Sequence, residues 1–496
     1  MKRSYAARVF SILKRFTMPA LILGALIAAI VGSNKYGYDD VETLPKSIEN
    51  TDELETQVFS IRRTPELLSS PLELEALVKD LDLLMSSVPS SSCLVVAVGG
   101  EPVFSVRENI PLSSGTNAKV ITAASALLEL GPEFTYETIL AAEREPNEDG
   151  SLLSTDLYIF GGGDPVLMTN SYIELLPENF STIHTSADQL ADLTVGMNIL
   201  FIQGAVLVNE SRYDESRTVE SWSEDIQEQS LIGSLSASLL DQGYDGLKNN
   251  YNSQRGVEDP PPLTPSRDPA IRFAASFDDL LEARNVIILE SGREFSGILP
   301  DDLVVLLSIE SPPMSQIVKQ MLVNDDSMTA EMLVKEIGYS RSGEGKSSSG
   351  TTGITEIIRG AGLPETGLLV VDGSGISTGN QATCGIMQGI ADHEPVKAFL
   401  FEAFPVAGVE GTIAQEFQNS VFNGNLNAKV SYTETTVALV GYFTADSGEE
   451  MTISFMVNHD ESDDWIETEI DSFYISLGNA LRTFSSGLPI ELFEPK

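Results

Sequence analysis

The sequence predicts an α/β protein of the α+β type, in which an antiparallel sheet carries helices on its faces and a smaller domain is inserted between two parts. Two hairpin patterns support this. Residues 93–106, "CLVVAVGGEPVFSV", predict two apolar strands joined at Gly99-Gly100. Residues 435–458, "TTVALVGYFTADSGEEMTISFMVN", predict two more strands, and residues 465–484 a closing helix. Strands that meet through hairpins, with helices gathered toward the chain ends, are typical of such a sheet.

The amino terminus combines positive charge with an apolar run. Residues 16–33, "FTMPALILGALIAAIVGS", contain no charged residue, and five cations precede them: Lys2, Arg3, Arg8, Lys14 and Arg15. This length lies at the border between a signal segment and a membrane-spanning helix. The basic flank places residues 1–15 in the cytoplasm and the remainder outside. We expect an uncleaved membrane anchor rather than a cleaved signal, because no strong cleavage site follows.

The remaining chain divides by composition. A polar, acidic linker follows the anchor, and residues 72–88 have helical periodicity. Proline-rich residues 252–270 are typical of a connection. The predicted division is an acidic linker over 34–71, a first part of the main domain over 72–140, an inserted region over 141–300 and a second part over 301–496.

The charge and the cysteine content exclude several classes of function. The chain has 30 Lys and Arg against 73 Asp and Glu, a formal charge of −43, which argues against nucleic acid as a partner. Cys93 and Cys384 match no metal-binding spacing. They are either buried thiols or one long-range disulfide in an oxidising compartment. Three scattered histidines supply neither a zinc site nor a Ser-His-Asp triad, so we expect no metal and no cofactor.

A candidate catalytic pair opens a predicted helix in residues 110–134, "IPLSSGTNAKVITAASALLELGPEF". Thr116 and Lys119 are three residues apart and therefore share one helix face. A hydroxyl one turn before a lysine is the layout of an S-x-x-K acyl-transfer site. The alternative is that Thr116 is only a helix N-cap, for which threonine is favoured.

Short segments along the chain occur in the order of a known family. They include "FGGGDPVL", "GAVLVNESRYD", "GSLSA", "DDSMTAEMLVKEIG", "VVDGSGIST", "FPVAGVEGTI" and "NAKVSYTETTVALVGYF". From about residue 75 to 485 the chain resembles the D-alanyl-D-alanine carboxypeptidase/endopeptidase family, the low-molecular-mass class C penicillin-binding proteins. The resemblance implies a penicillin-binding-protein/β-lactamase-like transpeptidase fold. It also implies action on peptidoglycan stem peptides through an acyl-enzyme.

The resemblance places three catalytic elements on this chain. The family's S-x-x-K, S-x-N and K-T-G correspond to Thr116–Lys119, Asp325-Asp326-Ser327 and Lys429-Val430-Ser431. The second is fixed by the following Ala330-Glu331; an alternative register makes Ser327 the relay serine. In the family the first serine is acylated, the first lysine serves as the base, the serine of S-x-N relays protons and the K-T-G strand binds substrate. Both lysines remain here, whereas the two serines, the asparagine, the threonine and the glycine are replaced.

The replacements oppose catalysis. A carboxylate at Asp325 near Lys119 and Lys429 favours their charged forms, whereas a general base needs a lowered pKa. Val430 lacks the hydroxyl expected to meet the substrate carboxylate, and Ser431 adds a side chain where glycine lets substrate approach.

A loop with the sequence "DGSGIS" supplies two further substrate-binding candidates, Asp372 and Ser374. We expect this loop near the cleft, and the alternative is that both residues serve only turn geometry.

Two functional hypotheses follow. The first is a weakly active or inactive cell-envelope relative, a pseudoenzyme that binds stem peptides or other envelope components. The alternative is an active peptidoglycan peptidase that uses Thr116 as nucleophile.

Overall fold

The structure is a computed structural model in which the chain divides into two units, Met1–Thr64 and Pro65–Lys496. It describes residues 66–484 of the second unit, apart from 153–154, 177–182, 230, 246–263, 296–298, 301 and 460–464, and apart from the side chains of 66–72 and 466–467.

Two of the predicted segments at the amino terminus fall outside this description. The basic tail over 1–15 and the anchor over 16–33 lie beyond the described residues, as does most of the acidic linker. The last residues of that linker belong to helix α2 (Glu66–Met85). Within the described part of the chain, no helix is long and apolar enough to cross a membrane.

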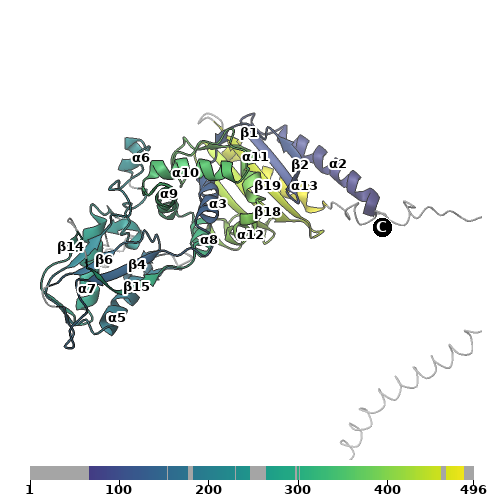
Figure 1. Ribbon diagram of the computed structural model, residues 1–496. Coiled ribbons are helices and arrows are strands. Elements are labelled where there is room, and N and C mark those ends of the chain that lie inside the picture. The colour runs from purple at the N-terminus through teal and green to yellow at the C-terminus, as the bar shows by residue number, and fades with distance from the viewer. Residues whose placement is uncertain are drawn as a thin grey trace, which may run out of the picture. The chain divides into compact units, whose positions relative to one another are not determined.

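The main sheet has five strands in the order β17-β18-β19-β1-β2, and every neighbouring pair is antiparallel. Its strands are β1 (Ser92–Val98), β2 (Glu101–Val106), β17 (Leu426–Tyr432), β18 (Thr436–Thr444) and β19 (Glu450–Asn458). Both predicted hairpins form, as β1-β2 and β18-β19. The two ends of the fold meet where β1 pairs with β19 (Figure 1), which confirms the predicted antiparallel sheet.

Helices cover both faces of this sheet. In β1, Cys93 and Val95 enter one core while Leu94 and Val96 enter the other. This is why the strand is apolar throughout instead of alternating. The second core includes α2 and α13 (Trp465–Arg482). The first surrounds α3 (Ala118–Glu129) and includes α8 (Met314–Asn324), α9 (Ser327–Ser342), α10 (Ser347–Gly360), α11 (Cys384–Ala391) and α12 (Glu394–Ala403).

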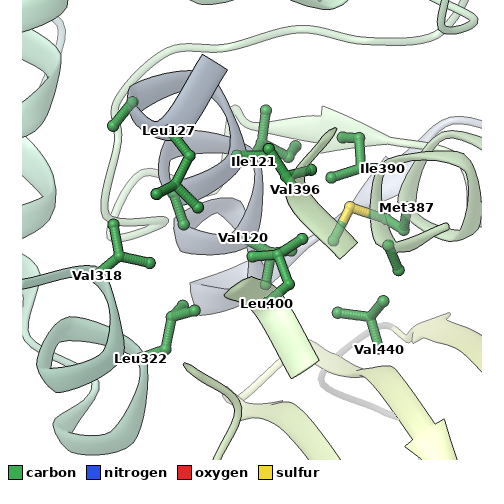
Figure 2. Close-up of a cluster of buried hydrophobic side chains, with 14 of the residues drawn as sticks. Val120, Ile121, Leu127, Val318, Leu322, Met387, Ile390, Val396, Leu400 and Val440 are labelled. Atoms are coloured by element: carbon green, nitrogen blue, oxygen red, sulfur yellow. The ribbon is translucent and has the colours of Figure 1, made fainter. Parts of the chain in front are cut away.

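Helix α3 lies at the centre of the first core (Figure 2). Its side chains Val120, Ile121 and Leu127 occur at helical spacing and are buried. Around them lie side chains of α8, α11, α12 and β18: Val318, Leu322, Met387, Ile390, Val396, Leu400 and Val440. The helix that carries the predicted catalytic pair is therefore packed on several sides.

A second five-stranded sheet is built from the middle of the chain, in the order β14-β10-β6-β4-β15. Its strands are β4 (Glu137–Ala142), β6 (Leu157–Phe160), β10 (Val206–Asn209), β14 (Arg293–Glu294) and β15 (Val304–Glu310). Strand β4 pairs antiparallel with β6 and β15, whereas β10 pairs parallel with β6 and β14. Helices α5 (Ala187–Gly196) and α7 (Pro269–Glu282) supply buried apolar residues to its core. The predicted insertion over 141–300 falls within this part of the chain, and these residues are called the inserted region below.

Short elements complete the fold. They are β3 (Leu112–Ser113), β5 (Ser151–Leu152), β7 (Leu167–Met168), α4 (Asn170–Ile173), β8 (Thr185–Ser186), β9 (Phe201–Ile202), α6 (Glu224–Glu228), β11 (Tyr244–Asp245), β12 (Thr264–Pro265), β13 (Ile287–Ile288) and β16 (Gln381–Ala382).

Buried ion pairs attach the inserted region to α9. Arg212 donates two hydrogen bonds to the buried Glu336, at 2.6 and 3.0 Å, and the Tyr213 hydroxyl donates a third at 2.7 Å. The residue before Glu336, the buried Lys335, pairs with Asp214. Bidentate and charge-assisted hydrogen bonds are among the stronger polar contacts in proteins, so this cluster fixes α9 against the inserted region.

The two cysteines form one disulfide. Cys93 of β1 is bonded to Cys384 at the start of α11, with a Cα–Cα distance of 5.9 Å and 291 residues of separation. Both are fully buried. The buried-thiol alternative is therefore wrong, and the bond fastens a helix of the first core to the centre of the sheet.

We expect loss of this bond to lower the free energy of unfolding by about 2–4 kcal/mol, because the reduced unfolded chain regains the freedom that the closed loop removes. Urea unfolding with and without reductant measures the effect. The matched control is a Cys93→Ala, Cys384→Ala double variant, whose stability must not respond to reductant. Equal unfolding midpoints for the oxidised and reduced wild type would contradict the expectation.

Candidate active site

Thr116 lies in a tight turn just before α3. Residues Gly115–Asn117 form a 3₁₀ turn and α3 begins at Ala118. The N-cap position belongs to Asn117, whose side chain instead donates to the Lys429 carbonyl at 3.2 Å. The interpretation of Thr116 as an N-cap is therefore wrong. Gly115 has φ +51°, and a Cβ there would lie 2.4 Å from the Ser431 hydroxyl oxygen, so this turn requires glycine.

Asp325 contacts both lysines of the predicted site. Its Oδ1 lies 2.8 Å from Lys119 Nζ and 3.2 Å from Lys429 Nζ. Both lysines are fully buried. Among the described residues no hydrogen bond joins Ser327 to either lysine, so the register that places Asp325 beside them is the one the geometry favours. Three elements distant in sequence thus converge on one carboxylate oxygen.

The backbone around Asp325 is shaped to present it. Helix α8 ends at Asn324, and Asp325 adopts the left-handed conformation (φ 56°, ψ 38°), which aspartate tolerates better than most residues. Asp326 then caps α9 by accepting from the Thr329 N–H at 3.1 Å and from its hydroxyl at 2.7 Å. Gln242 of the inserted region donates to Asp326 at 2.9 Å. The loop is therefore held from both sides.

Burial and charge shift the pKa values of this cluster in opposite directions. Burial raises the pKa of Asp325, but Lys429 and Lys119 together bring it below its usual value. Burial lowers the pKa of Lys429 from 10.5 to about 8, although Asp325 acts to raise it. The expectation that Asp325 would keep the pKa of Lys429 high is therefore wrong, because desolvation of the buried ammonium group lowers this pKa by more than the carboxylate raises it.

The two lysines have different partners. Lys429 Nζ donates to the Thr116 hydroxyl at 3.2 Å and to its neighbour's carbonyl, that of Val430, at 3.0 Å. Lys119 Nζ donates to the Ser374 carbonyl at 2.8 Å. No hydrogen bond joins Lys119 to Thr116 within the described part of the chain. The candidate nucleophile is thus in contact with the lysine of the third element and not with that of the first.

The backbone N–H of Thr116 is already hydrogen-bonded to Ser431. Its hydroxyl oxygen accepts that hydrogen bond at 2.9 Å, and the side chain is buried. A backbone N–H at a nucleophile is the kind of donor that forms an oxyanion hole in acyl transfer. Here a side chain of the chain itself fills the position. Val430 points elsewhere, since its side chain belongs to the core on the other face of the sheet.

Asp372 is buried and holds its own loop together through hydrogen bonds. Asp372 accepts from Trp222 Nε1 at 2.7 Å, from Asn380 Nδ2 at 2.6 Å and from the N–H groups of Ser377 and Gly375 at 2.7 and 2.8 Å. Its side chain is fully buried. The structure thus ties Asp372 into the loop itself, and its predicted role in substrate binding stays a prediction.

Glu331 holds the next part of this loop and was missed in the sequence. Its buried carboxylate accepts from the N–H groups of Gly373 and Ser374 at 3.1 and 2.8 Å. Burial, followed by the charge of Asp372, raises the pKa of Glu331 to about 8. Ser374 in turn accepts from Lys119 through its carbonyl, while its own side chain is buried. In the sequence, Glu331 was used only to locate the second catalytic element, and no sequence pattern predicts its contact with the loop of Gly373 and Ser374.

The D-Ala-D-Ala carboxypeptidase 3 (S13) family description matches residues 74–265 and 258–474, so the chain belongs to this family. A D-alanyl-D-alanine carboxypeptidase of Actinomadura sp. (strain R39) is 25% identical over 452 residues, covering 77% of this chain and 81% of that protein. Carboxypeptidase DacB of Mycolicibacterium smegmatis is 23% identical over 371 residues, covering 73% of this chain and 74% of that protein.

Solved structures agree on the fold. Penicillin-binding protein 4 (dacB) of Haemophilus influenzae superimposes with a TM-score of 0.63 at 19% identity, over 81% of this chain and 99% of that one. Its complex with a β-lactam gives a TM-score of 0.59 over the same shares of the two chains. The predicted family and fold are therefore confirmed.

We predict that Lys429 makes stability rise with pH above neutrality. Its pKa is about 8 in the folded chain against an ordinary 10.5, so between these values the unfolded chain binds more protons. The free energy of unfolding then increases with pH, by roughly 3 kcal/mol over the interval. Urea unfolding across this range should show the increase in wild type and lose it in Lys429→Met.

The control for this experiment is Lys319→Met, since Lys319 is an exposed lysine of α8. It should keep the wild-type increase. The same pH dependence in wild type and Lys429→Met would contradict the assignment.

Proposed function

We propose that this chain is a cell-envelope member of its family in which serine-type acyl transfer is weak or absent, while the cleft is retained for binding stem peptides or other envelope components. One observation carries the proposal. A single carboxylate oxygen of Asp325 is shared by Lys119 and Lys429, the two lysines that the family's chemistry would use.

The contacts of Lys119 oppose a role as general base. A general base needs a free lone pair within reach of the proton it removes. Lys119 Nζ forms an ion pair with the carboxylate of Asp325 and donates a hydrogen bond to the Ser374 carbonyl. Both are acceptors, which suit an ammonium group and leave no described partner for an amine lone pair. Among the described residues, Lys119 therefore contacts two acceptors and no hydroxyl from which it could remove a proton.

The oxyanion position beside Thr116 is also obstructed. A substrate oxygen that approached the Thr116 N–H would have to displace the Ser431 hydroxyl, which is buried and already bonded there. Loss of one such donor costs about 3 kcal/mol of transition-state stabilisation. Threonine also restricts its own hydroxyl, because its branched Cβ limits χ1. Both effects act beside the charge cluster, and together they oppose acylation.

A second candidate function is an active peptidase with Thr116 as nucleophile. The contact of 3.2 Å between Lys429 Nζ and Thr116 Oγ1 favours it, as does a pKa of about 8 for Lys429. Threonine hydroxyls do act as nucleophiles beside a base. Under this alternative, acylation increases as pH passes 8 and Lys429 loses its proton.

We predict that a fluorescent penicillin forms no stable adduct with the protein at neutral pH. Thr116→Ser alone should restore little labelling, because Asp325 and Ser431 still occupy the site. Labelling should appear only after Asp325→Ser with Ser327→Asn, and should increase with Val430→Thr and Ser431→Gly. Gel fluorescence after denaturation measures the covalent adduct.

The control for this series is Thr116→Ala in the most restored variant, which must abolish labelling. Strong labelling of the unaltered protein that is lost in Thr116→Ala would overturn the proposal in favour of the active peptidase.

The proposed location rests on residues 16–33, which we expect to anchor the protein with its folded part outside the cytoplasm. Full-length protein should remain in the membrane fraction after a high-salt wash, and a variant without residues 1–33 should be released. Recovery of the full-length chain as a soluble cytoplasmic protein would contradict the anchor.

A further inference from the structure

A pocket of about 270 Å³ lies behind the strand that carries Lys429. Along β17, Lys429 and Ser431 contact Thr116 on one face of the sheet. Tyr432 is the next residue, so its side chain points to the opposite face, which α13 covers. The pocket is lined by Gln415, Glu416, Phe417, Gln418, Asn419, Ser420, Tyr432, Asp471, Tyr474 and Ile475. It is therefore separate from the candidate active site.

Three aromatic side chains line this pocket, from three different segments. Phe417 belongs to the loop before β17, Tyr432 to β17 and Tyr474 to α13. The rings of Phe417 and Tyr474 meet edge to face at 5.2 Å. Phe417 has φ 59°, a conformation that is unfavourable for a bulky residue and that accumulates at functional sites. The strained backbone thus sets an aromatic ring into the pocket wall.

Tyr474 gives the pocket a polar atom with an unused hydrogen-bonding capacity. Its side chain is 2% exposed, and its hydroxyl makes no hydrogen bond of standard geometry among the described residues, although Tyr432 lies close enough to interact with it. Burial first, and then the neighbouring Tyr432, raise the pKa of Tyr474 well above its usual value, so the hydroxyl keeps its proton. A buried polar group without a well-formed hydrogen bond is unfavourable, and a ligand that bonds to it would relieve this cost.

The charges at the pocket determine which ligand fits. Its lining includes the carboxylates of Glu416 and Asp471 and no lysine, arginine or histidine. An anion would be repelled here. A cationic group would be attracted by the two carboxylates, by the faces of the aromatic rings and by the lone pairs of the Tyr474 hydroxyl.

We propose that this pocket binds a primary alkylammonium group, such as the side-chain amine of a lysine-like residue or one end of a free diamine. The volume lies just under the range of about 300–1,000 Å³ that small molecules occupy, which suits one such side chain. The proposal does not depend on whether Thr116 is catalytic.

The test uses the full-length protein and ligand-observed NMR titration with three probes. Cadaverine and Nα-acetyl-lysine amide should bind saturably, and N,N′-diacetylcadaverine, which has no charge, should not. Tighter binding of the lysine amide identifies a peptide-borne amine, and tighter binding of cadaverine a free diamine. Tyr474→Phe should weaken binding by about ten-fold through loss of a hydrogen bond to a charged group.

Asp471→Asn should weaken binding by about two- to five-fold, the size typical of an exposed ion pair. The matched control is Glu469→Gln, two residues away on α13 and outside the pocket lining, which should leave affinity unchanged. The proposal is overturned if no saturable binding occurs, or if the uncharged probe binds equally. It is also overturned if affinity is the same in Tyr474→Phe and Asp471→Asn as in wild type.

Discussion

The carboxylate of Asp325 between two buried ammonium groups is the contact on which the centre of this molecule depends. Lys119 comes from α3, Lys429 from β17 and Asp325 from the connection between α8 and α9. Buried charges are stable only when they are paired, and removing one partner from such a set typically costs several kcal/mol. The same carboxylate therefore joins a central helix, a sheet strand and a helix junction.

The connection that carries Asp325 is held in turn by the inserted region. Gln242 reaches the adjacent Asp326, Arg212 and Tyr213 bond to Glu336 further along α9, and Trp222 bonds to Asp372 of the neighbouring loop. Each contact joins the middle of the chain to an element beside the lysines. The inserted region thus acts on the site through backbone position, since the same loop also holds the carbonyl that Lys119 contacts.

The sequence predicted the features that depend on local pattern. The runs around Gly99-Gly100 and Asp446-Ser447-Gly448 have the strand length and turn residues of hairpins, and both form. What it could not supply were quantities set by tertiary packing. The pKa of Lys429 depends on complete burial, which no residue near it in the chain reveals. The hydrogen bond from the Thr116 N–H to Ser431 spans 315 residues, and the N-cap interpretation of Thr116 failed because Asn117 takes that position. The pairing of the cysteines was open for the same reason.

The pairing of β1 with β19 has a consequence for how the chain is made. Ser92 is opposite Val457, so the middle of the main sheet joins residues synthesised more than 300 positions apart. At about 5–20 residues per second, the hairpin β1-β2 waits on the order of half a minute with one long apolar edge unpaired. Such an edge is a template for wrong association, and closing so distant a contact is slow. The main sheet is therefore completed only after its last strands have been synthesised, and a chain truncated before β19 would leave the apolar edge of β1 unpaired.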